Sequence, residues 1–219
     1  MFHGGRRLAD GDLIARLGGM RRPHTCIKKL FDQQGTDKGK WFGGLYDVLL
    51  QPYRETIKCV VEVGIGTLIP HAPSSMVGWG LENYRPGGSL RAWRDFLPNA
   101  EIYGLDVALD TQFTDEHRIH TYLCDSTDRD QAEQFFNRIA PIRPDLVIDD
   151  GLHTVEAQIG TLRNFFPSLL PGGLYVIEDV SPEHTPMIVA GAVDVHTDCH
   201  FFVDSRPEPW VAIVIRKPV

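Results

Sequence analysis

Short apolar runs of β-forming residues alternate with helical runs from residue 58 onward, and this alternation constrains the fold more than any other feature of the chain. Five runs have the length and composition of buried strands, namely residues 59–63, 102–105, 119–123, 146–148 and 174–177. Three stretches between them have helical character, namely residues 89–96, 128–139 and 154–165. Because strands that alternate with helices form parallel sheets covered on both faces, the sequence predicts an α/β fold with a doubly wound, mostly parallel sheet.

The two ends of the chain depart from this alternation. Residues 1–57 are predicted to be mainly helical, with Gly35 as a helix stop. We therefore expect an N-terminal helical extension over 1–57 that covers a catalytic domain over 58–219. Two apolar runs near the C-terminus, 200–203 and 210–215, are joined by a short turn that contains two prolines, which predicts an antiparallel hairpin. Dinucleotide-binding dehydrogenases usually lack such a hairpin.

The composition limits the class of protein. With 219 residues, of which 42% are hydrophobic and 23% charged, the chain fits one medium α/β domain with an N-terminal extension. A net charge of −7 argues against nucleic-acid binding, which requires a basic surface. The four cysteines form no C-x-x-C pair, and no long apolar segment follows the arginine pairs near the N-terminus. We therefore expect a cytoplasmic protein with neither a secretory signal nor a membrane span. A homo-oligomer is compatible with the sequence.

Two carboxylates follow each of the last two predicted parallel strands. Asp149 and Asp150 end one apolar run, and Glu178 and Asp179 end the next. Because parallel strands open at one edge of a sheet, these acids converge, and their mutual repulsion favours a divalent cation among them. His153 follows Asp150 by three residues, so a helix that begins there would place His153 one turn above this acid. The alternative is that Asp149 and Asp150 cap the next helix while His153 makes a surface hydrogen bond.

The turn after the first predicted strand has features of a nucleotide-binding loop. Gly64 and Gly66 allow the backbone to approach a ligand, because no Cβ intervenes. A dinucleotide fingerprint requires glycine or alanine at position 69, where this chain has Ile69. Three acids in register on successive strands are better placed for an adenosyl ligand: Glu62, Asp106 and Asp125. Each acid taken singly is more often a helix cap or a turn former, but three together favour the ligand.

Several short motifs resemble, in the same order, those of the metal-dependent sugar O-methyltransferases of macrolide biosynthesis. They are GTDKG at 35–39, EVGIG at 62–66, GGSLRAW at 87–93, IYGLD at 102–106, DDGLH at 149–153 and GGLYVIED at 172–179. The resemblance spans roughly residues 30–180, and the last two motifs are the most specific.

The resemblance implies a class I methyltransferase fold with S-adenosylmethionine as methyl donor and Mg²⁺ as the metal. It implies that Asp150, Glu178 and Asp179 hold the metal, and that His153 acts with Asp150 in catalysis as the general base. The cofactor-binding residues expected from the motifs and strand ends are Thr36, Lys38, Glu62, Gly64, Gly66, Ser89, Asp106, Asp125 and Asp149. The chemistry is consistent, because magnesium lowers the pKa of a substrate hydroxyl and a histidine can take its proton near neutral pH.

The chain departs from the family pattern in two respects. Leu152 stands where the family usually has serine, and 219 residues leave no room for the large N-terminal auxiliary domain of the macrolide enzyme, so the sugar substrate is not carried over. A long insertion at 67–86, which includes Met76, Trp79 and Tyr84, is predicted either to cover the donor site, to contact an acceptor or to pack on the N-terminal helices.

We therefore expect an S-adenosylmethionine-dependent, magnesium-assisted O-methyltransferase. Its acceptor is expected to be a hydroxylated small molecule, in particular a sugar or a glycosylated natural product. Two alternatives stay open, namely a catechol-type diol O-methyltransferase and a non-catalytic protein that binds S-adenosylmethionine.

Overall fold

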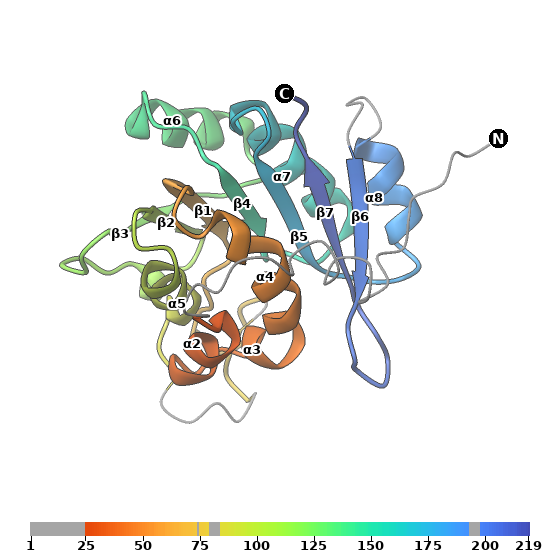
Figure 1. Cartoon of the computed structure of the whole chain (residues 1–219), viewed down its shortest axis with the longest axis horizontal. Helices are drawn as coiled ribbons and strands as arrows, with labels where there is room; N and C mark the ends of the chain where they lie inside the picture. Colours follow the sequence, from red (N-terminus) through yellow and green to blue (C-terminus); the bar gives the residue numbers. More distant parts are fainter. Residues whose placement is uncertain (1–24, 74, 79–83, 193–197) are drawn as a thin grey trace.

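A computed structural model describes residues 25–73, 75–78, 84–192 and 198–219, and it contains a seven-stranded sheet in the order β3-β2-β1-β4-β5-β7-β6 (Figure 1). Five strands are parallel: β1 (Cys59–Val63), β2 (Glu101–Asp106), β3 (Ile119–Leu123), β4 (Leu146–Asp149) and β5 (Leu174–Val180). The last strand, β7 (Val211–Arg216), runs antiparallel to β5 on one side and to β6 (Asp198–Val203) on the other. The predicted doubly wound sheet and C-terminal hairpin are thus confirmed.

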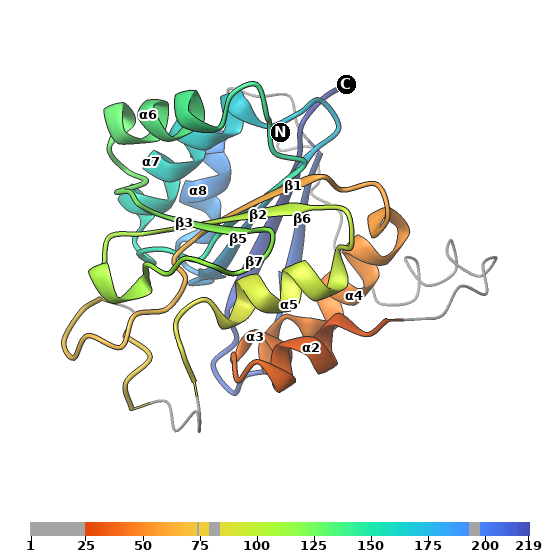
Figure 2. The ribbon, with the colours of Figure 1, turned by 90° about the vertical axis from the view of Figure 1, so that its left-hand side faces the viewer.

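Helices cover both faces of the sheet (Figure 2). One face carries α2 (Ile27–Gln33), α3 (Lys38–Trp41), α4 (Gly43–Leu50) and α5 (Gly88–Phe96). The other carries α6 (Arg129–Ile139), α7 (Val155–Phe165) and α8 (Thr185–Ala192). Three single turns of 3-10 helix complete the described elements: Gln51–Tyr53, Leu109–Thr111 and Phe166–Ser168. The sequence did not predict α8, and residues 1–24 of the predicted extension lie outside the described residues.

Each strand contributes alternate side chains to two separate cores. Val60, Ile148 and Val176 pack in the cluster that α2, α4 and α5 complete. Their neighbours Val61 and Val147 face α6 and α7 on the other side. Burial on both faces explains why the central strands are continuous apolar runs rather than alternating ones.

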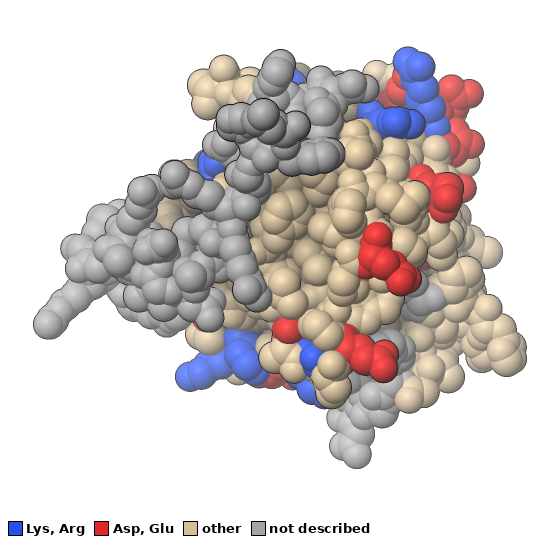
Figure 3. Space-filling model, turned by 90° about the vertical axis from the view of Figure 1, so that its right-hand side faces the viewer, with Lys and Arg blue, Asp and Glu red and all other residues tan. Residues whose placement is uncertain are grey.

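The carboxyl ends of the parallel strands meet at one edge of the sheet, and the loops after β4 and β5 are neighbours there because Asp149 pairs with Ile177. The edge strand β6 runs in the same direction as β5, so the hairpin loop over 204–210 also lies at this edge (Figure 1). The face of the molecule beyond β6 and α8 is largely uncharged where it is coloured in Figure 3. Of the helices that the structure describes, none combines the length and apolar character needed to cross a bilayer.

Candidate active site at the carboxyl edge of the sheet

A cleft of about 390 Å³ opens where the parallel strands end. Its volume is that of a typical small-molecule site. Nine of the predicted site residues line it: Lys38, Gly64, Gly66, Asp106, Asp125, Asp150, His153, Glu178 and Asp179. We call this the donor cleft, because it contains the residues predicted to bind an adenosyl ligand.

Gly64 and Gly66 shape the donor cleft at the end of β1. Both have left-handed backbone conformations, with φ values of +78° and +79°. A Cβ on Gly64 would overlap the backbone of Asp150, and a Cβ on Gly66 would overlap the hydroxyl of Tyr84. Glycine is therefore required at both positions for the backbone conformation and for the close approach of the neighbouring chain.

Asp106 and Asp125 lie in the donor cleft at the ends of β2 and β3. The Asp106 carboxylate accepts hydrogen bonds from the backbone nitrogens of Ile65 and Ala108, both at 3.0 Å. Burial raises the pKa of Asp106, and these backbone hydrogen bonds oppose the rise. Asp125 accepts bonds from the backbone nitrogen and the hydroxyl of Thr127, at 2.9 and 2.6 Å. The two carboxylates thus occupy the successive strand ends that the sequence predicted.

Four other predicted cofactor-binding residues are buried behind the wall of the donor cleft: Thr36, Glu62, Ser89 and Asp149. Glu62 points toward α5, where its carboxylate accepts a hydrogen bond from Trp93 Nε1 at 2.9 Å. Burial raises the pKa of Asp149 to about 7, despite a hydrogen bond from the backbone nitrogen of Gly151. These residues can support the wall, and their role in cofactor binding stays a prediction.

Lys38 connects three carboxylates beneath the cleft. Its side chain is only 4% exposed, and its Nζ lies 2.5 Å from Asp150 Oδ2, 2.5 Å from Glu178 Oε2 and 3.2 Å from Glu62 Oε1. Burial alone would lower the pKa of Lys38, but the three carboxylates outweigh burial and hold this pKa well above its usual value. Lys38 is therefore a fixed positive charge among the acids of the site.

Glu178, a predicted metal ligand, already has two partners within the chain. Besides Lys38, it accepts a hydrogen bond from the Tyr46 hydroxyl of α4. Burial raises the pKa of Glu178 well above its usual value, and Lys38 opposes this rise. The sequence did not identify Tyr46 as a site residue, because a tyrosine in an apolar helix predicts core packing. Metal binding by Glu178 stays a prediction, in which the metal shares the carboxylate with these partners.

Asp150, His153 and Asp179 form a group that is able to hold a metal ion. One ligand atom of each lies within 4.8 Å of the others. Carboxylate oxygens are the ligands that Mg²⁺ prefers, and Asp150 and Asp179 supply them, so the residues present fit a divalent cation. Asp179 is also ion-paired with Arg206 of the β6–β7 loop, which the sequence did not predict.

The backbone of Asp179 is unusual. Its φ is +48°, in the left-handed region, and the pairing of β5 with β7 shifts register between Ile177 and Val180. A regular strand would point Glu178 and Asp179 to opposite faces. The bulge interrupts this alternation, and both carboxylates line the cleft. Non-glycine residues are uncommon in this conformation, although aspartate adopts it more readily than most.

His153 lies in a loop rather than on a helix. The helix predicted over 154–165 is confirmed as α7, which begins at Val155, where the Thr154 hydroxyl accepts a hydrogen bond from the backbone nitrogen of Ala157 at 3.3 Å. Because this helix does not begin at Asp150, His153 does not lie one helical turn above that acid. The loop nevertheless places His153 Nε2 3.4 Å from Asp150 Oδ1. Burial lowers the pKa of His153, but the carboxylate of Asp150 more than offsets this effect, and the pKa lies above its usual value.

The described part of the insertion borders the donor cleft. Met76 and residues 72–73 line the cleft, and the Tyr84 hydroxyl donates to the carbonyl of Gly66 at 3.2 Å. These contacts favour the interpretation that the insertion covers the donor site. Trp79, the other aromatic residue singled out in the insertion, lies outside the described residues.

Comparison with known proteins identifies relatives of the chain, although no protein-family model matches it. It is 39% identical over 147 residues to the mycinamicin VI 2''-O-methyltransferase of Micromonospora griseorubida, covering 67% of this chain and 33% of that protein. It is 32% identical over 193 residues to the 8-demethyl-8-alpha-L-rhamnosyl tetracenomycin-C 2'-O-methyltransferase of Streptomyces olivaceus, covering 86% of this chain and 44% of that protein. The chain thus spans less than half the length of these relatives.

The fold is similar to solved structures of MycE, a methyltransferase of the mycinamycin biosynthetic pathway. The structure of MycE with Mg, SAH and mycinamycin VI matches with a TM-score of 0.65 and 28% sequence identity, covering 91% of this chain and 56% of that one. A second structure, with Mg and SAH, matches with a TM-score of 0.65 and 27% identity, over the same shares of the two chains. These similarities confirm the predicted class I fold and the resemblance on which the site was predicted.

Proposed function

Since this chain is a relative of the mycinamicin and tetracenomycin sugar O-methyltransferases, we propose that it transfers the methyl group of S-adenosylmethionine to a hydroxyl group of a sugar or glycoside. The observation that carries the proposal is the position of Asp150, His153 and Asp179 in the wall of the donor cleft. A ligand in that cleft is bordered by groups that can bind a cation and accept a proton. One relative is named for 2'-O-methylation of a rhamnosyl tetracenomycin and the other for 2''-O-methylation of mycinamicin VI, which supports the acceptor class.

The donor cleft provides the groups that an adenosyl ligand needs. S-adenosylmethionine supplies a methyl group on a sulfonium centre, which an oxygen nucleophile can displace in line. Gly64 and Gly66 shape the loop at the end of β1, because their left-handed backbone lets Asp150 and Tyr84 approach closely and form the wall against which the ligand would bind. The Asp106 carboxylate makes two backbone hydrogen bonds and keeps further acceptor capacity for ribose hydroxyls. Asp125, one strand further along, would accept a hydrogen bond from the adenine amine.

Asp150 and Asp179 would hold the magnesium ion, with Glu178 as the predicted third ligand. When bound, magnesium lowers the pKa of a substrate hydroxyl and fixes its orientation. The chain contributes the placement of these carboxylates, which Lys38 and Arg206 already hold in position through ion pairs. A bound magnesium ion would share these carboxylates with Lys38 and Arg206.

His153 would accept the proton of the attacking hydroxyl. Its imidazole lies at the junction of the donor cleft with the cation-binding group, and Asp150 is close enough to orient the ring. The bound metal would already have lowered the pKa of the hydroxyl, so an imidazole is a strong enough base to accept its proton.

Calorimetry and an acceptor screen test the proposal. We expect S-adenosylmethionine to bind with or without magnesium, and S-adenosylhomocysteine to be released when magnesium and a methyl glycoside are both present. Asp179→Asn should require much more magnesium for the same rate, because a charged ligand becomes neutral. Full turnover in excess chelator would contradict the metal mechanism. Release with catechol but not with glycosides would favour the diol alternative, and donor binding without any turnover would indicate a binding protein.

A further inference from the structure

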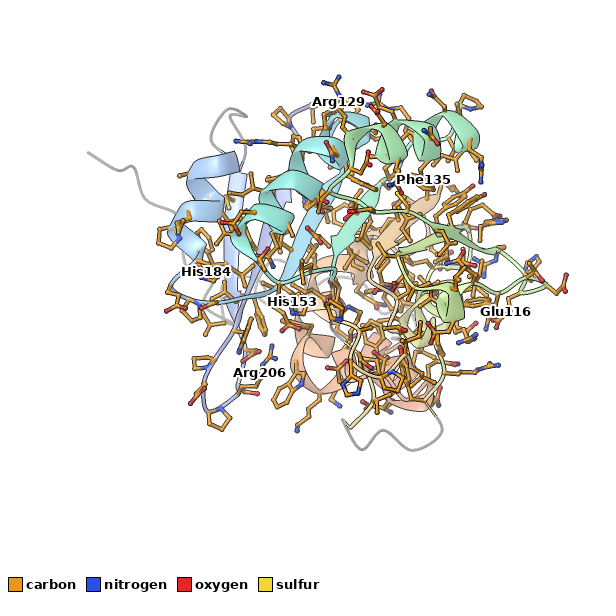
Figure 4. All side chains as sticks on the ribbon, turned by 180° about the vertical axis from the view of Figure 1, so that it is seen from behind. Glu116, Arg129, Phe135, His153, His184 and Arg206 are labelled. Carbon is orange, nitrogen blue, oxygen red and sulfur yellow. The ribbon has the colours of Figure 1, made fainter. Side chains whose placement is uncertain are left out.

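A second cleft adjoins the donor cleft at the same edge of the sheet. It is lined by Trp41, His153, Asp179, Arg206, Pro207, Glu208 and Trp210. His153 and Asp179 line both clefts, so the predicted base and one predicted metal ligand stand at their junction. In Figure 4 His153 and Arg206 lie close together at this edge of the molecule. We call this second space the tryptophan cleft.

Two half-buried indoles and one guanidinium form its aromatic wall. Trp41 ends α3, whereas Trp210 comes from the end of the β6–β7 loop, 169 residues later in the chain by their numbers. The Arg206 guanidinium carbon lies 5.0 Å from the Trp41 ring centroid and 5.7 Å from that of Trp210. The Trp210 ring also meets the His153 ring edge-on, with centroids 6.3 Å apart. The aromatic wall therefore extends up to the predicted base.

The loop that carries Trp210 is held by hydrogen bonds at its base. The Asp204 nitrogen donates to the Trp210 carbonyl at 3.0 Å, and the Trp210 nitrogen donates to Asp204 Oδ1 at 3.2 Å. The same carboxylate accepts a hydrogen bond from the backbone nitrogen of Arg206 at 3.0 Å and is ion-paired with its guanidinium. Because these contacts fix the loop in advance, a ligand that binds against Trp210 does not have to order it.

The charges of the tryptophan cleft favour a neutral ligand. Arg206 is paired with both Asp179 and Asp204, so little of its positive charge is left to attract an anionic ligand. The exposed Glu208 of the same lining would repel an anionic ligand. A cationic ligand would meet the guanidinium itself in the wall between the indoles. A flat apolar surface with a few polar groups beside it is instead typical of sites for neutral small molecules.

We propose that Trp41, Arg206 and Trp210 form the acceptor-binding platform, on which the pyranose ring of a neutral sugar stacks with a hydroxyl group directed toward His153 and Asp179. This inference rests on the proposed function. A pyranose has an apolar face of C–H groups, which matches an indole, and a rim of hydroxyls, which matches the polar groups of Arg206 and Asp179. The position of Trp210 against His153 makes the platform a determinant of which acceptor reaches the base.

Ligand-observed saturation-transfer NMR on the full chain, loaded with S-adenosylhomocysteine and magnesium, tests the platform with methyl α-L-rhamnopyranoside as the probe. We expect saturation of the C–H protons on one face of the sugar. Trp210→Ala and Trp41→Ala should each weaken binding about tenfold, whereas Trp210→Phe should keep most of the affinity because an aromatic face remains. Tyr53→Ala, at a half-exposed aromatic residue outside both clefts, is the matched control and should bind the probe as the unaltered chain does.

Calorimetric titration of S-adenosylhomocysteine into the same samples separates the two hypotheses. The platform would be overturned if both alanine variants kept the probe affinity of the unaltered chain, or if the unaltered chain did not bind the probe at tens of millimolar. As long as the chain still binds S-adenosylhomocysteine, either result would leave the proposed function intact. Competition of the probe by catechol at equal affinity would overturn the assignment to a sugar. Failure of the unaltered chain to bind S-adenosylhomocysteine would overturn the proposed function itself. Retained donor affinity in each variant shows that the variant is folded.

Discussion

Replacing Lys38 with methionine should destabilise the fold strongly when no metal is present. Methionine has a similar length but no charge, so Glu62 and Glu178, which are at most 1% exposed, would lose their cationic partner. Removing one partner of a buried ion pair typically costs about 3–5 kcal/mol. The variant can limit this loss by protonating a buried carboxylate. In the unfolded chain a carboxyl has its ordinary pKa, and relative to that state protonating one carboxyl at pH 7 costs about 4 kcal/mol. We therefore expect Lys38→Met to lower the free energy of unfolding by roughly 3–5 kcal/mol.

Urea denaturation at pH 7 in the presence of chelator measures this loss. Lys28→Met is the matched control, because Lys28 pairs with Asp32 at 2.9 Å on the surface of α2, with both side chains about half exposed. An exposed pair of this kind contributes little, so the control should change the free energy of unfolding by no more than about 0.5 kcal/mol. A loss below about 1 kcal/mol for Lys38→Met would refute the reasoning, since the carboxylates would then be stable without Lys38.

Magnesium provides a second comparison on the same variants. A bound cation stabilises the folded state according to its concentration and affinity, and it can replace part of the charge that Lys38→Met removes. Magnesium should therefore stabilise Lys38→Met more than it stabilises the unaltered chain, whereas Lys28→Met should respond as the unaltered chain does. Equal stabilisation of all three proteins would show that the metal does not interact with the carboxylates that Lys38 holds.

Three further predictions address single residues of the site. Gly64→Ala should abolish binding of S-adenosylhomocysteine and destabilise the fold, because its Cβ would overlap the Asp150 backbone. The control Gly172→Ala has a similar φ of +77° but a nearest contact of 3.7 Å, so it should show only the cost of the left-handed conformation, about 1 kcal/mol. Equal effects of the two variants in calorimetry and thermal denaturation would contradict the argument from close approach. Asp106→Ala should weaken donor binding by on the order of 1.5–3 kcal/mol because hydrogen bonds to a charged group are lost, and an unchanged dissociation constant would remove Asp106 from the donor site. His153→Ala should lower turnover roughly 100-fold or more with little change in donor and metal affinity; loss of metal binding would make His153 a ligand, and near-normal turnover would make it structural.

Four of the five parallel strands, β1, β2, β4 and β5, were predictable to within a few residues because they are mostly buried on both faces. The edge strand β3 is partly exposed, and its β-forming residues identified it instead. Strands buried on both faces are short apolar runs bounded by glycine or by acids, and their pattern depends on the sequence alone. The helix α8 was missed for the opposite reason. Thr185–Ala192 contains mostly apolar residues with a proline and a glycine, so it lacks the periodicity that identifies an amphipathic helix. Its helical state depends on packing, for example between Gly191 and Ile159 of α7.

The site residues also differ in whether a local sequence pattern could predict them. Gly64, Gly66 and Asp106 were found because a strand end followed by glycine or by an acid is a local signal. The pairing of Lys38 with Glu178 joins residues 140 positions apart, and no local pattern specifies it. Arg206 likewise has no motif around it, and its role follows from the direction of β6, which brings the hairpin loop to the edge where Asp179 lies.

Two positively charged side chains change the behaviour that is expected of the acidic site when no metal is bound. Four converging acids suggest, on their own, loops that repel one another and are ordered only by a metal. The structure instead places Lys38 between Asp150 and Glu178 and places Arg206 beside Asp179. Most of the repulsion is thus compensated within the chain, so chelation should stop turnover without unfolding the protein. Because Arg206 also forms part of the tryptophan cleft, any metal that draws Asp179 away from it changes the charge presented to an acceptor, which couples metal binding to acceptor binding.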